Sequence, residues 1–286
     1  MDDERRVVVG IDGSPPARCA LRWALAEAQL LDRTLEVLHA WREPAVLVPE
    51  EYDSALVEAG HMDEAALKLI DRELDAVGAD LPDTFPIERT EVHGFAARAL
   101  VEASQRAELV VVGRRGMGGF PHELIGPKAV QVAHHARSPV AVVPDRWPGD
   151  GRGVVVGVDG SDHAAKALRW AQAEADRRAT DLTAVMAWGL FDQHHIEADA
   201  AFDPNYGAAD ARAALEHALG AALGDASQVK TKVVNDLPAR GLVETSRTAE
   251  LLVVGARGLG GFGDLLLGSV SHRCLTHAVC PTVVVR

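Results

Sequence analysis

The sequence predicts an α/β protein of two similar domains, each an open, doubly wound parallel sheet of five strands with helices on both faces. The first observation is a tandem repeat: residues 7–41 align without a gap with residues 154–188, and 19 of these 35 positions are identical. The second is that short Val-rich runs alternate with longer stretches of helical spacing, the order typical of parallel α/β sheets. The third is that these runs are continuously apolar, as in strands covered on both faces.

The first half contains five candidate strands, at about residues 6–12, 34–41, 86–92, 108–113 and 139–143. After the first of them, Ser14 can cap a helix that has Pro15 in its first turn. Small or apolar residues recur at helical spacing from Ala17 to Leu31, which predicts a helix with one buried face. In such a sheet, ligands bind at the carboxyl ends of the strands where the strand order reverses, so we expect the functional site there.

The repeat also predicts the domain boundaries. Residues 108–120 match residues 250–262 at an offset of 142 rather than 147, so five residues are missing from the middle of the second half. A repeat of this length predicts whole domains rather than solenoid units. Residues 145–153 are rich in Pro and Gly, which is typical of a linker. We therefore predict one domain at residues 1–144 and a second at residues 154–286.

Composition and charge argue against several classes of protein. Hydrophobic residues make up 48% and charged residues 25% of the chain, the balance of a folded globular protein. The net charge of −13 and the aromatic content of 5% argue against a nucleic-acid binder. No apolar run approaches the length of a membrane-spanning helix, and the start lacks the pattern of a secretory signal. With three cysteines that we expect to be reduced thiols, the sequence predicts a soluble cytoplasmic protein.

The loop after the first strand of each half is the first candidate for ligand binding. It reads Gly10-Ile-Asp12-Gly13-Ser14 in the first half and Gly157-Val-Asp159-Gly160-Ser161 in the second. Asp and Ser after a strand are more often turn and capping residues, which is the simpler interpretation of this loop. The loop lacks the Gly-x-Gly-x-x-Gly fingerprint of dinucleotide-binding folds, and the chain has no Walker loop. The sequence therefore excludes ordinary P-loop chemistry.

The glycine-rich loop after the fourth strand is the second candidate. In the second half it reads Gly255-x2-Gly258-x9-Gly268-Ser269 and leads into a helical pattern. Glycines permit close approach of the backbone, so N–H groups here and at the start of the following helix can face a phosphate. Ser269 can add its hydroxyl group. A flexible glycine turn without a ligand stays open as the alternative.

These two loops, together with the repeated Leu-Arg-Trp-Ala segment, resemble the universal stress protein family, specifically the tandem members of its ATP-binding branch. The resemblance implies an adenine nucleotide alpha hydrolase-like fold with ATP as the ligand. It implies that Asp159 contacts the nucleotide, that the backbone of Ala187 lies near the adenine, and that the glycine-rich loop holds ribose and phosphates. The candidate binding residues are Asp159, Gly160, Ser161, Ala187, Gly255, Arg257, Gly258, Gly268 and Ser269 in the second half, and Asp12, Gly13, Ala40, Gly113, Gly116 and Gly126 in the first.

The first half departs from the family motif at one position. Pro127 stands where the second half has Ser269, and proline offers neither a hydroxyl nor a backbone N–H to a phosphate. We therefore expect the first site to bind more weakly. Arg114 and Arg115 could offset part of the loss, but we expect them, like Arg257, to be solvated loop residues. Mg²⁺ should accompany ATP, because the charged nucleotide meets a protein of net charge −13.

Three other features receive structural interpretations. His134-His135 and His194-His195 are adjacent pairs whose side chains point to different sides, so we expect no metal site. Ser271 is expected on the surface of the helix after the glycine-rich loop. Residues 42–65 lack clear periodicity and are interpreted as a mobile flap over the site.

The sequence also predicts how the halves assemble and what they do. The final strands, at residues 140–143 and 282–286, are expected to pair antiparallel, which would make the chain an internal pseudo-dimer. A homodimer of whole chains is implied by the resemblance alone. Because no partnered general base and no lysine are expected at the phosphates, we predict an ATP-dependent regulatory or stress-response protein. A slow ATPase or phosphotransferase using Asp159 to hold a metal ion, and a scaffold with a vestigial site, stay open as alternatives.

Overall fold

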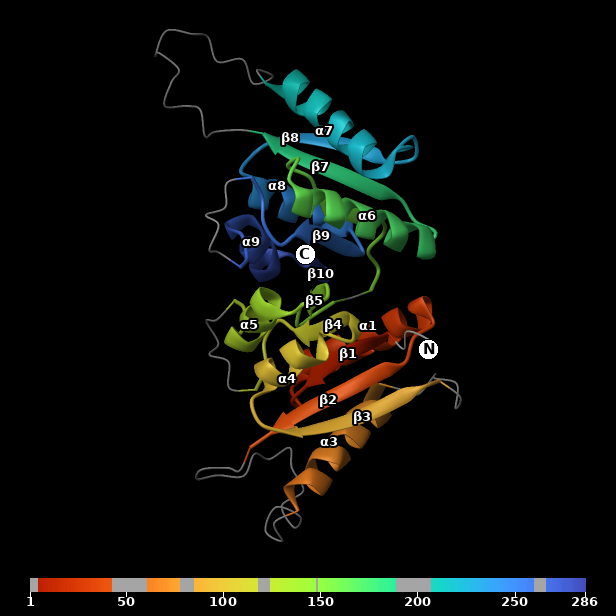
Figure 1. The fold of residues 1–286 in the computed structure, drawn as a ribbon, viewed down its shortest axis with the longest axis vertical. Coiled ribbons are helices and arrows are strands. Elements are labelled where there is room, and N and C mark those ends of the chain that lie inside the picture. Colours follow the sequence, from red (N-terminus) through yellow and green to blue (C-terminus); the bar gives the residue numbers. More distant parts are fainter. Residues whose placement is uncertain are drawn as a thin grey trace. The chain divides into compact units, whose positions relative to one another are not determined.

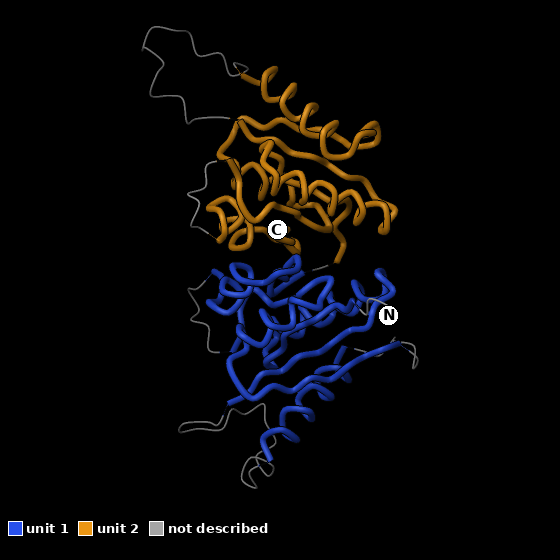
Figure 2. Tube along the Cα trace, in the orientation of Figure 1, with its two compact units in different colours: residues 1–147 blue, residues 148–286 orange. Residues whose placement is uncertain are grey.

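The computed structural model describes residues 5–42, 61–77, 85–117, 124–147, 149–188, 207–259 and 266–286. The chain divides into two compact units, residues 1–147 and residues 148–286 (Figure 2). Each unit alternates strands and helices along the chain, as a parallel α/β fold requires.

The first unit is an open parallel sheet with the strand order β3-β2-β1-β4-β5. Its strands are β1 (Arg6–Ile11), β2 (Leu35–Trp41), β3 (Ile87–His93), β4 (Ala107–Gly113) and β5 (Val140–Val143). Its helices are α1 (Pro15–Leu31), α3 (Met62–Val77), α4 (Ala96–Ala103) and α5 (Pro127–His135). α1 packs with α3 and α4 packs with α5, so helices cover both faces of the sheet (Figure 1). The strand order reverses between β1 and β4, where a ligand crevice is expected.

The second unit repeats this topology with the strand order β10-β9-β6-β7-β8, again with parallel neighbours. Its strands are β6 (Val154–Gly157), β7 (Leu182–Trp188), β8 (Lys230–Asn235), β9 (Leu251–Gly255) and β10 (Thr282–Val285). Its helices are α6 (Asp162–Arg177), α7 (Ala208–Leu223), α8 (Pro238–Thr245), the short 3-10 helix η1 (Ser246–Thr248) and α9 (Ser269–His277). α6 packs with α7 and α8 packs with α9, as in the first unit. The strand order reverses between β6 and β9.

Local chemistry explains where these elements lie. Val7, Val8 and Val9 of β1 have no exposed surface, because this central strand is covered on both faces. The Oγ of Ser14 accepts a hydrogen bond from the N–H of Ala17 at 3.3 Å and so caps α1. Ser161 caps α6 in the same way. The first loop of each unit is therefore fixed to the helix that follows it.

Buried carboxylates add a feature that the sequence pattern does not predict. Glu36 of β2 is fully buried, and its carboxylate accepts hydrogen bonds from Arg6 at 3.3 Å and from Arg106 at 2.5 Å. Glu73 of α3 is bound by two nitrogens of Arg18 of α1, at 2.8 and 3.0 Å. Such charges are tolerated inside a protein only when they are paired. The second pair joins α1 to α3 over one face of the first sheet.

The structure confirms the predicted fold class. Each of the five strands predicted in the first half is present, and its ends lie within one residue of the expected ones. Of the stretch interpreted as a flap, residues 43–60 lie outside the described residues, and α3 begins at Met62 within it. His194 and His195 also lie outside the described residues. No helix in the described ranges is both long and apolar enough to cross a membrane, and the three cysteines are free thiols.

Candidate functional site

The loop after the first strand makes its turn with a glycine in each unit. Gly13 has a φ of +82° and Gly160 a φ of +84°, in the left-handed region that side chains disfavour. This turn directs the chain from the end of β1 or β6 into the capped helix. It also turns the preceding residue, Asp12 or Asp159, toward the glycine-rich loop.

The carboxylate of this aspartate joins the two candidate loops. In the first unit, Oδ1 of Asp12 accepts hydrogen bonds from the N–H and the hydroxyl of Ser14, at 3.2 and 2.6 Å. Its Oδ2 accepts a hydrogen bond from the N–H of Met117, on the glycine-rich loop, at 2.8 Å. In the second unit, Asp159 accepts from the N–H groups of Ser161 at 3.0 Å and Leu259 at 3.1 Å. The same clamp thus closes both sites.

The first two glycines of each glycine-rich loop are required by the protein itself. A Cβ atom on Gly255 would lie 2.7 Å from the carbonyl carbon of His163 in the first turn of α6. A Cβ atom on Gly116 would lie 2.5 Å from Oδ2 of Asp12, and Gly258 meets Asp159 in the same way. These glycines permit the close packing of strand, helix and clamp, whether or not a ligand binds.

The third glycine is different. Among the described residues, a Cβ atom on Gly268 would come no closer than 3.5 Å to any neighbour, and one on Gly126 no closer than 3.4 Å. Both residues have ordinary negative φ angles, −74° and −75°. A small side chain at this glycine, just before the start of α9 or α5, would therefore make only ordinary van der Waals contacts with the described residues. A ligand that approaches the backbone there would explain why no side chain fills it.

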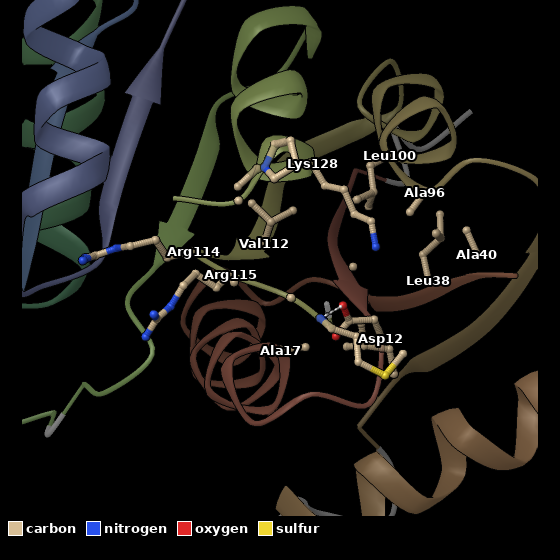
Figure 3. A pocket seen from close by; sticks show the side chains of 18 residues that line it. Asp12, Ala17, Leu38, Ala40, Ala96, Leu100, Val112, Arg114, Arg115 and Lys128 are labelled. Atoms are coloured by element: carbon tan, nitrogen blue, oxygen red, sulfur yellow. Dashed lines mark hydrogen bonds between the residues drawn. The ribbon is translucent and has the colours of Figure 1, made fainter. Parts of the chain in front are cut away.

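A cavity of about 240 Å³ lies at the carboxyl ends of β1, β2 and β4 in the first unit (Figure 3). Apolar side chains such as Leu38, Leu100 and Val112 form part of its wall. Five of the six first-half candidates, Asp12, Ala40, Gly113, Gly116 and Gly126, line this cavity. The sixth, Gly13, lies beside Asp12 on the turn. The fold thus brings together residues from three separate loops and strand ends.

Lys128 also lines this cavity, and the sequence analysis missed it. Figure 3 shows its side chain reaching from α5 into the space between Val112 and Leu38, above Asp12. The sequence analysis expected no lysine beside the glycine-rich loop, whereas the cavity of the first unit is lined by Lys128 together with Gly113, Gly116 and Gly126. The place of Lys128 directly after Pro127, in the first turn of the helix that follows the glycine-rich loop, was the signal available in the sequence.

The two arginines of this loop point elsewhere. In Figure 3 the side chains of Arg114 and Arg115 lead away from the cavity, although both residues contribute to its rim. Arg115 forms an ion pair with Asp145, so the interpretation as a simply solvated side chain misses a partner. The cation that reaches into the described cavity is Lys128.

The second unit brings its candidates together by the same contacts. Asp159, Gly160 and Ser161 follow β6, Ala187 lies near the end of the adjacent β7, and Gly255 ends β9. The Oγ of Ser161 lies 3.4 Å from the carbonyl oxygen of Arg257, next to Gly258. Gly268 is the N-cap of α9 and Ser269 its first residue.

Ser271 lies on α9, as expected, but the prediction that it is on the surface is wrong. Its side chain is buried, and its hydroxyl donates a hydrogen bond to the carbonyl oxygen of Gly255 at 2.6 Å. It therefore holds the start of α9 against the end of β9. The corresponding residue in α5 is Ala129.

A buried histidine lies beneath the first-unit site. His39 of β2 is 2% exposed, and its Nδ1 lies 2.9 Å from the carbonyl oxygen of Ile11. Burial lowers the pKa of His39 and the nearby Lys128 lowers it further, while the contact with Ile11 and the charge of Asp12 act in the opposite direction. The repeat places Met186 at the equivalent position of the second unit.

The site residues suit a phosphate better than a bare metal ion. No group of three His, Cys, Asp or Glu side chains that could hold a metal occurs among the described residues. Both carboxylate oxygens of Asp12 already accept hydrogen bonds. Mg²⁺ keeps several waters and often binds through substrate phosphates rather than through a cluster of protein side chains.

Two segments of the chain, residues 4–144 and residues 152–286, match the model of the Universal stress protein family. The chain belongs to this family. A universal stress protein of Mycolicibacterium smegmatis is 34% identical over 293 residues, covering 99% of this chain and 97% of that protein. One from Mycobacterium tuberculosis is 33% identical over 298 residues, covering 98% and 96%. The crystal structure of a universal stress protein from Archaeoglobus fulgidus has the same fold, with a TM-score of 0.66 at 18% identity over the full length of this chain and 99% of that one.

Substitution with alanine should distinguish a glycine that the fold requires, Gly258, from one that it does not, Gly268. Gly258→Ala should lower the free energy of unfolding by about 1–3 kcal/mol, because the new methyl group overlaps the Asp159 carboxylate. Gly268→Ala should change it by less than about 1 kcal/mol, because a lost N-cap preference and a stiffer unfolded chain oppose each other. Urea unfolding without nucleotide measures both. Equal destabilisation by the two substitutions would contradict the difference between the close contact at Gly258 and the ordinary contacts at Gly268.

His39 should make the stability of the first unit depend on pH. Below a pH of about 6.5 the unfolded chain protonates His39 more readily than the folded chain, whose buried imidazole has a lowered pKa. The stabilising effect of the neutral ring is complete above that pH and is lost as the pH falls. We expect the free energy of unfolding to drop less between pH 7.5 and 5.5 in His39→Met, which copies Met186, than in the wild type. Hydrogen exchange of residues 35–41 at the two pH values provides the measurement, and identical pH dependence in both proteins would contradict it.

Proposed function

We propose that this universal stress protein binds ATP at the carboxyl ends of the strands in each unit and acts as a nucleotide-dependent regulatory protein. The observation that carries the proposal is the pair of loops clamped by Asp12 or Asp159 beside a glycine at which the protein would tolerate a small side chain. Membership of the family in both halves supports it, because the second half contains the full glycine motif of the ATP-binding branch. The arrangement of the two loops and the spacing of the glycines thus both support ATP as the ligand.

In the proposed complex the adenine lies against the apolar end of the site and the phosphates lie at the third glycine. Leu38 offers an apolar contact near Ala40 in the first unit. At the other end, the first N–H groups of α5 and α9 have no partner within their helices, and they favour an anion. In α9 the hydroxyl of Ser269 adds a further donor. Mg²⁺ would enter with the phosphates and neutralise part of their charge.

Rapid catalysis is a weaker interpretation of the same site. Among the described residues, no group of three acidic, histidine or cysteine side chains could hold a metal ion. Both oxygens of Asp12 already accept hydrogen bonds that hold the loops together. Asp12 therefore joins the two loops, and we assign it no role as a base toward water or a substrate hydroxyl. Slow ATP hydrolysis and a nucleotide-free scaffold are the other outcomes of the test.

Calorimetric titration with ATP and Mg²⁺, followed by analysis of the bound species, tests the proposal. We expect two unequal sites and retained, unhydrolysed ATP. Ser269→Pro, which copies Pro127, should weaken the tighter site by roughly tenfold to several hundredfold, because each lost hydrogen bond to a charged group costs about 1–3 kcal/mol. Gly268→Ala should weaken the same site, because its methyl group occupies the space proposed for the phosphates.

Gly220→Ala is the matched control. Gly220 lies on α7, no atom would come within 4 Å of its added Cβ, and its φ is not in the left-handed region, so ATP binding should be unchanged. ADP with released phosphate would instead support the slow enzyme. Absence of binding would support the scaffold, and two equal sites would contradict the role given to Ser269.

A further inference from the structure

The two units differ in charge at the phosphate end of the proposed sites. Lys128 is the second residue of α5, and Val270 is the second residue of α9. The residue before each also differs, with Pro127 in the first unit and Ser269 in the second. The first unit therefore has a cation where the second has a hydroxyl group and one more N–H donor.

The environment of Lys128 suits an anionic ligand. Its side chain enters the cavity that Asp12 and Gly126 also line (Figure 3). Across the described ranges of the chain, no carboxylate forms an ion pair with its ammonium group, whereas the neighbouring Arg115 is paired with Asp145. A lysine that enters the cavity without a carboxylate partner can offer its positive charge to a phosphate.

Charge neutralisation is the main difficulty for a nucleotide at this site. ATP carries about four negative charges at neutral pH, and the carboxylate of Asp12 adds another close by, in a protein of net charge −13. A divalent cation can reduce this repulsion, and so can a lysine that contacts the phosphates. The first unit contains such a lysine, and the equivalent position of the second unit does not.

We infer that the first unit holds the phosphates through Lys128 and binds its nucleotide without a divalent cation, whereas the second unit needs Mg²⁺. This inference rests on the proposed function, because it concerns the same two sites. It gives the two units different ligands: free nucleotide in the first and the Mg²⁺ complex in the second. In the presence of Mg²⁺ the second unit binds more tightly, and in a chelator the first unit keeps its nucleotide.

The test measures each unit separately in the full-length chain. Gly268→Ala weakens the second site and leaves the first for titration, and Gly126→Ala does the reverse. ATP is titrated with Mg²⁺ and again with excess EDTA. We expect EDTA to change the affinity of the first unit by less than about threefold and to weaken the second by about tenfold or more, the size of one lost interaction with a charged group.

Exchanging the residues that differ provides the matched variants. In the Gly268→Ala background, Lys128→Val should make binding to the first unit dependent on Mg²⁺, and Lys128→Arg should keep it independent. In the Gly126→Ala background, Val270→Lys should reduce the loss that EDTA causes in the second unit. Lys128 is exposed, so urea unfolding without nucleotide should give the same stability for Lys128→Val as for its parent.

Each outcome bears on one proposal or on both. Binding to both units with the same dependence on Mg²⁺, or a first unit whose dependence is unchanged in Lys128→Val, would overturn the inference and leave the proposed function standing. Absence of nucleotide binding in either condition would overturn both. Retention by the first unit alone in EDTA, lost in Lys128→Val, would support the division between the units.

Discussion

Each proposed site depends on a carboxylate that joins two loops far apart in the sequence. Asp12 and Asp159 bind backbone N–H groups 105 and 100 residues further along the chain. The clamp explains the second glycine of the loop, because Gly116 or Gly258 must leave room for the carboxylate. The first glycine is explained by packing against α1 or α6. A Cβ atom on the third, Gly126 or Gly268, would make only ordinary van der Waals contacts with the described residues, so in the proposed sites this is the glycine that serves the ligand.

Both repeats keep the residues that join the two loops but differ in residues around the proposed sites. The aspartate, the cap serine and all three glycines occur in both units. Three exchanges lie in or beside the proposed sites: Pro127 and Lys128 against Ser269 and Val270 at the start of the helix after the glycine-rich loop, and His39 against Met186 in β2 and β7. Because the aspartate, the cap serine and the glycines are common to both units, these exchanges alter the chemistry that surrounds a shared set of residues. Two copies that began alike can therefore hold the same nucleotide by different interactions.

The sequence was sufficient for those parts that depend on local patterns. Continuous valine runs predicted the parallel strands, and Ser14 predicted the start of α1, because burial on both faces and helix capping are local constraints. The sequence was insufficient for long side chains, whose contacts depend on residues that only the fold brings close. Lys128 was overlooked because only the fold directs it into the cavity, and the Arg18–Glu73 pair because its members lie on different helices. The role of Asp12 lies between these cases, since the turn was predictable and the contact with Met117 was not.

Local groups, rather than the overall charge, decide whether such a chain can hold an anion. A net charge of −13 repels a nucleotide from a distance, but salt screens that repulsion beyond roughly 8 Å at physiological ionic strength. Within the site, N–H groups at a helix start and one lysine act at short range, where screening is weak. The same carboxylate that builds the site, Asp12, raises the local negative charge and so creates the need for a cation. In the inferred first site, Lys128 in the first turn of α5 supplies that cation. In the second site Val270 occupies the equivalent position of α9, so the positive charge must come from Mg²⁺ that binds with the nucleotide.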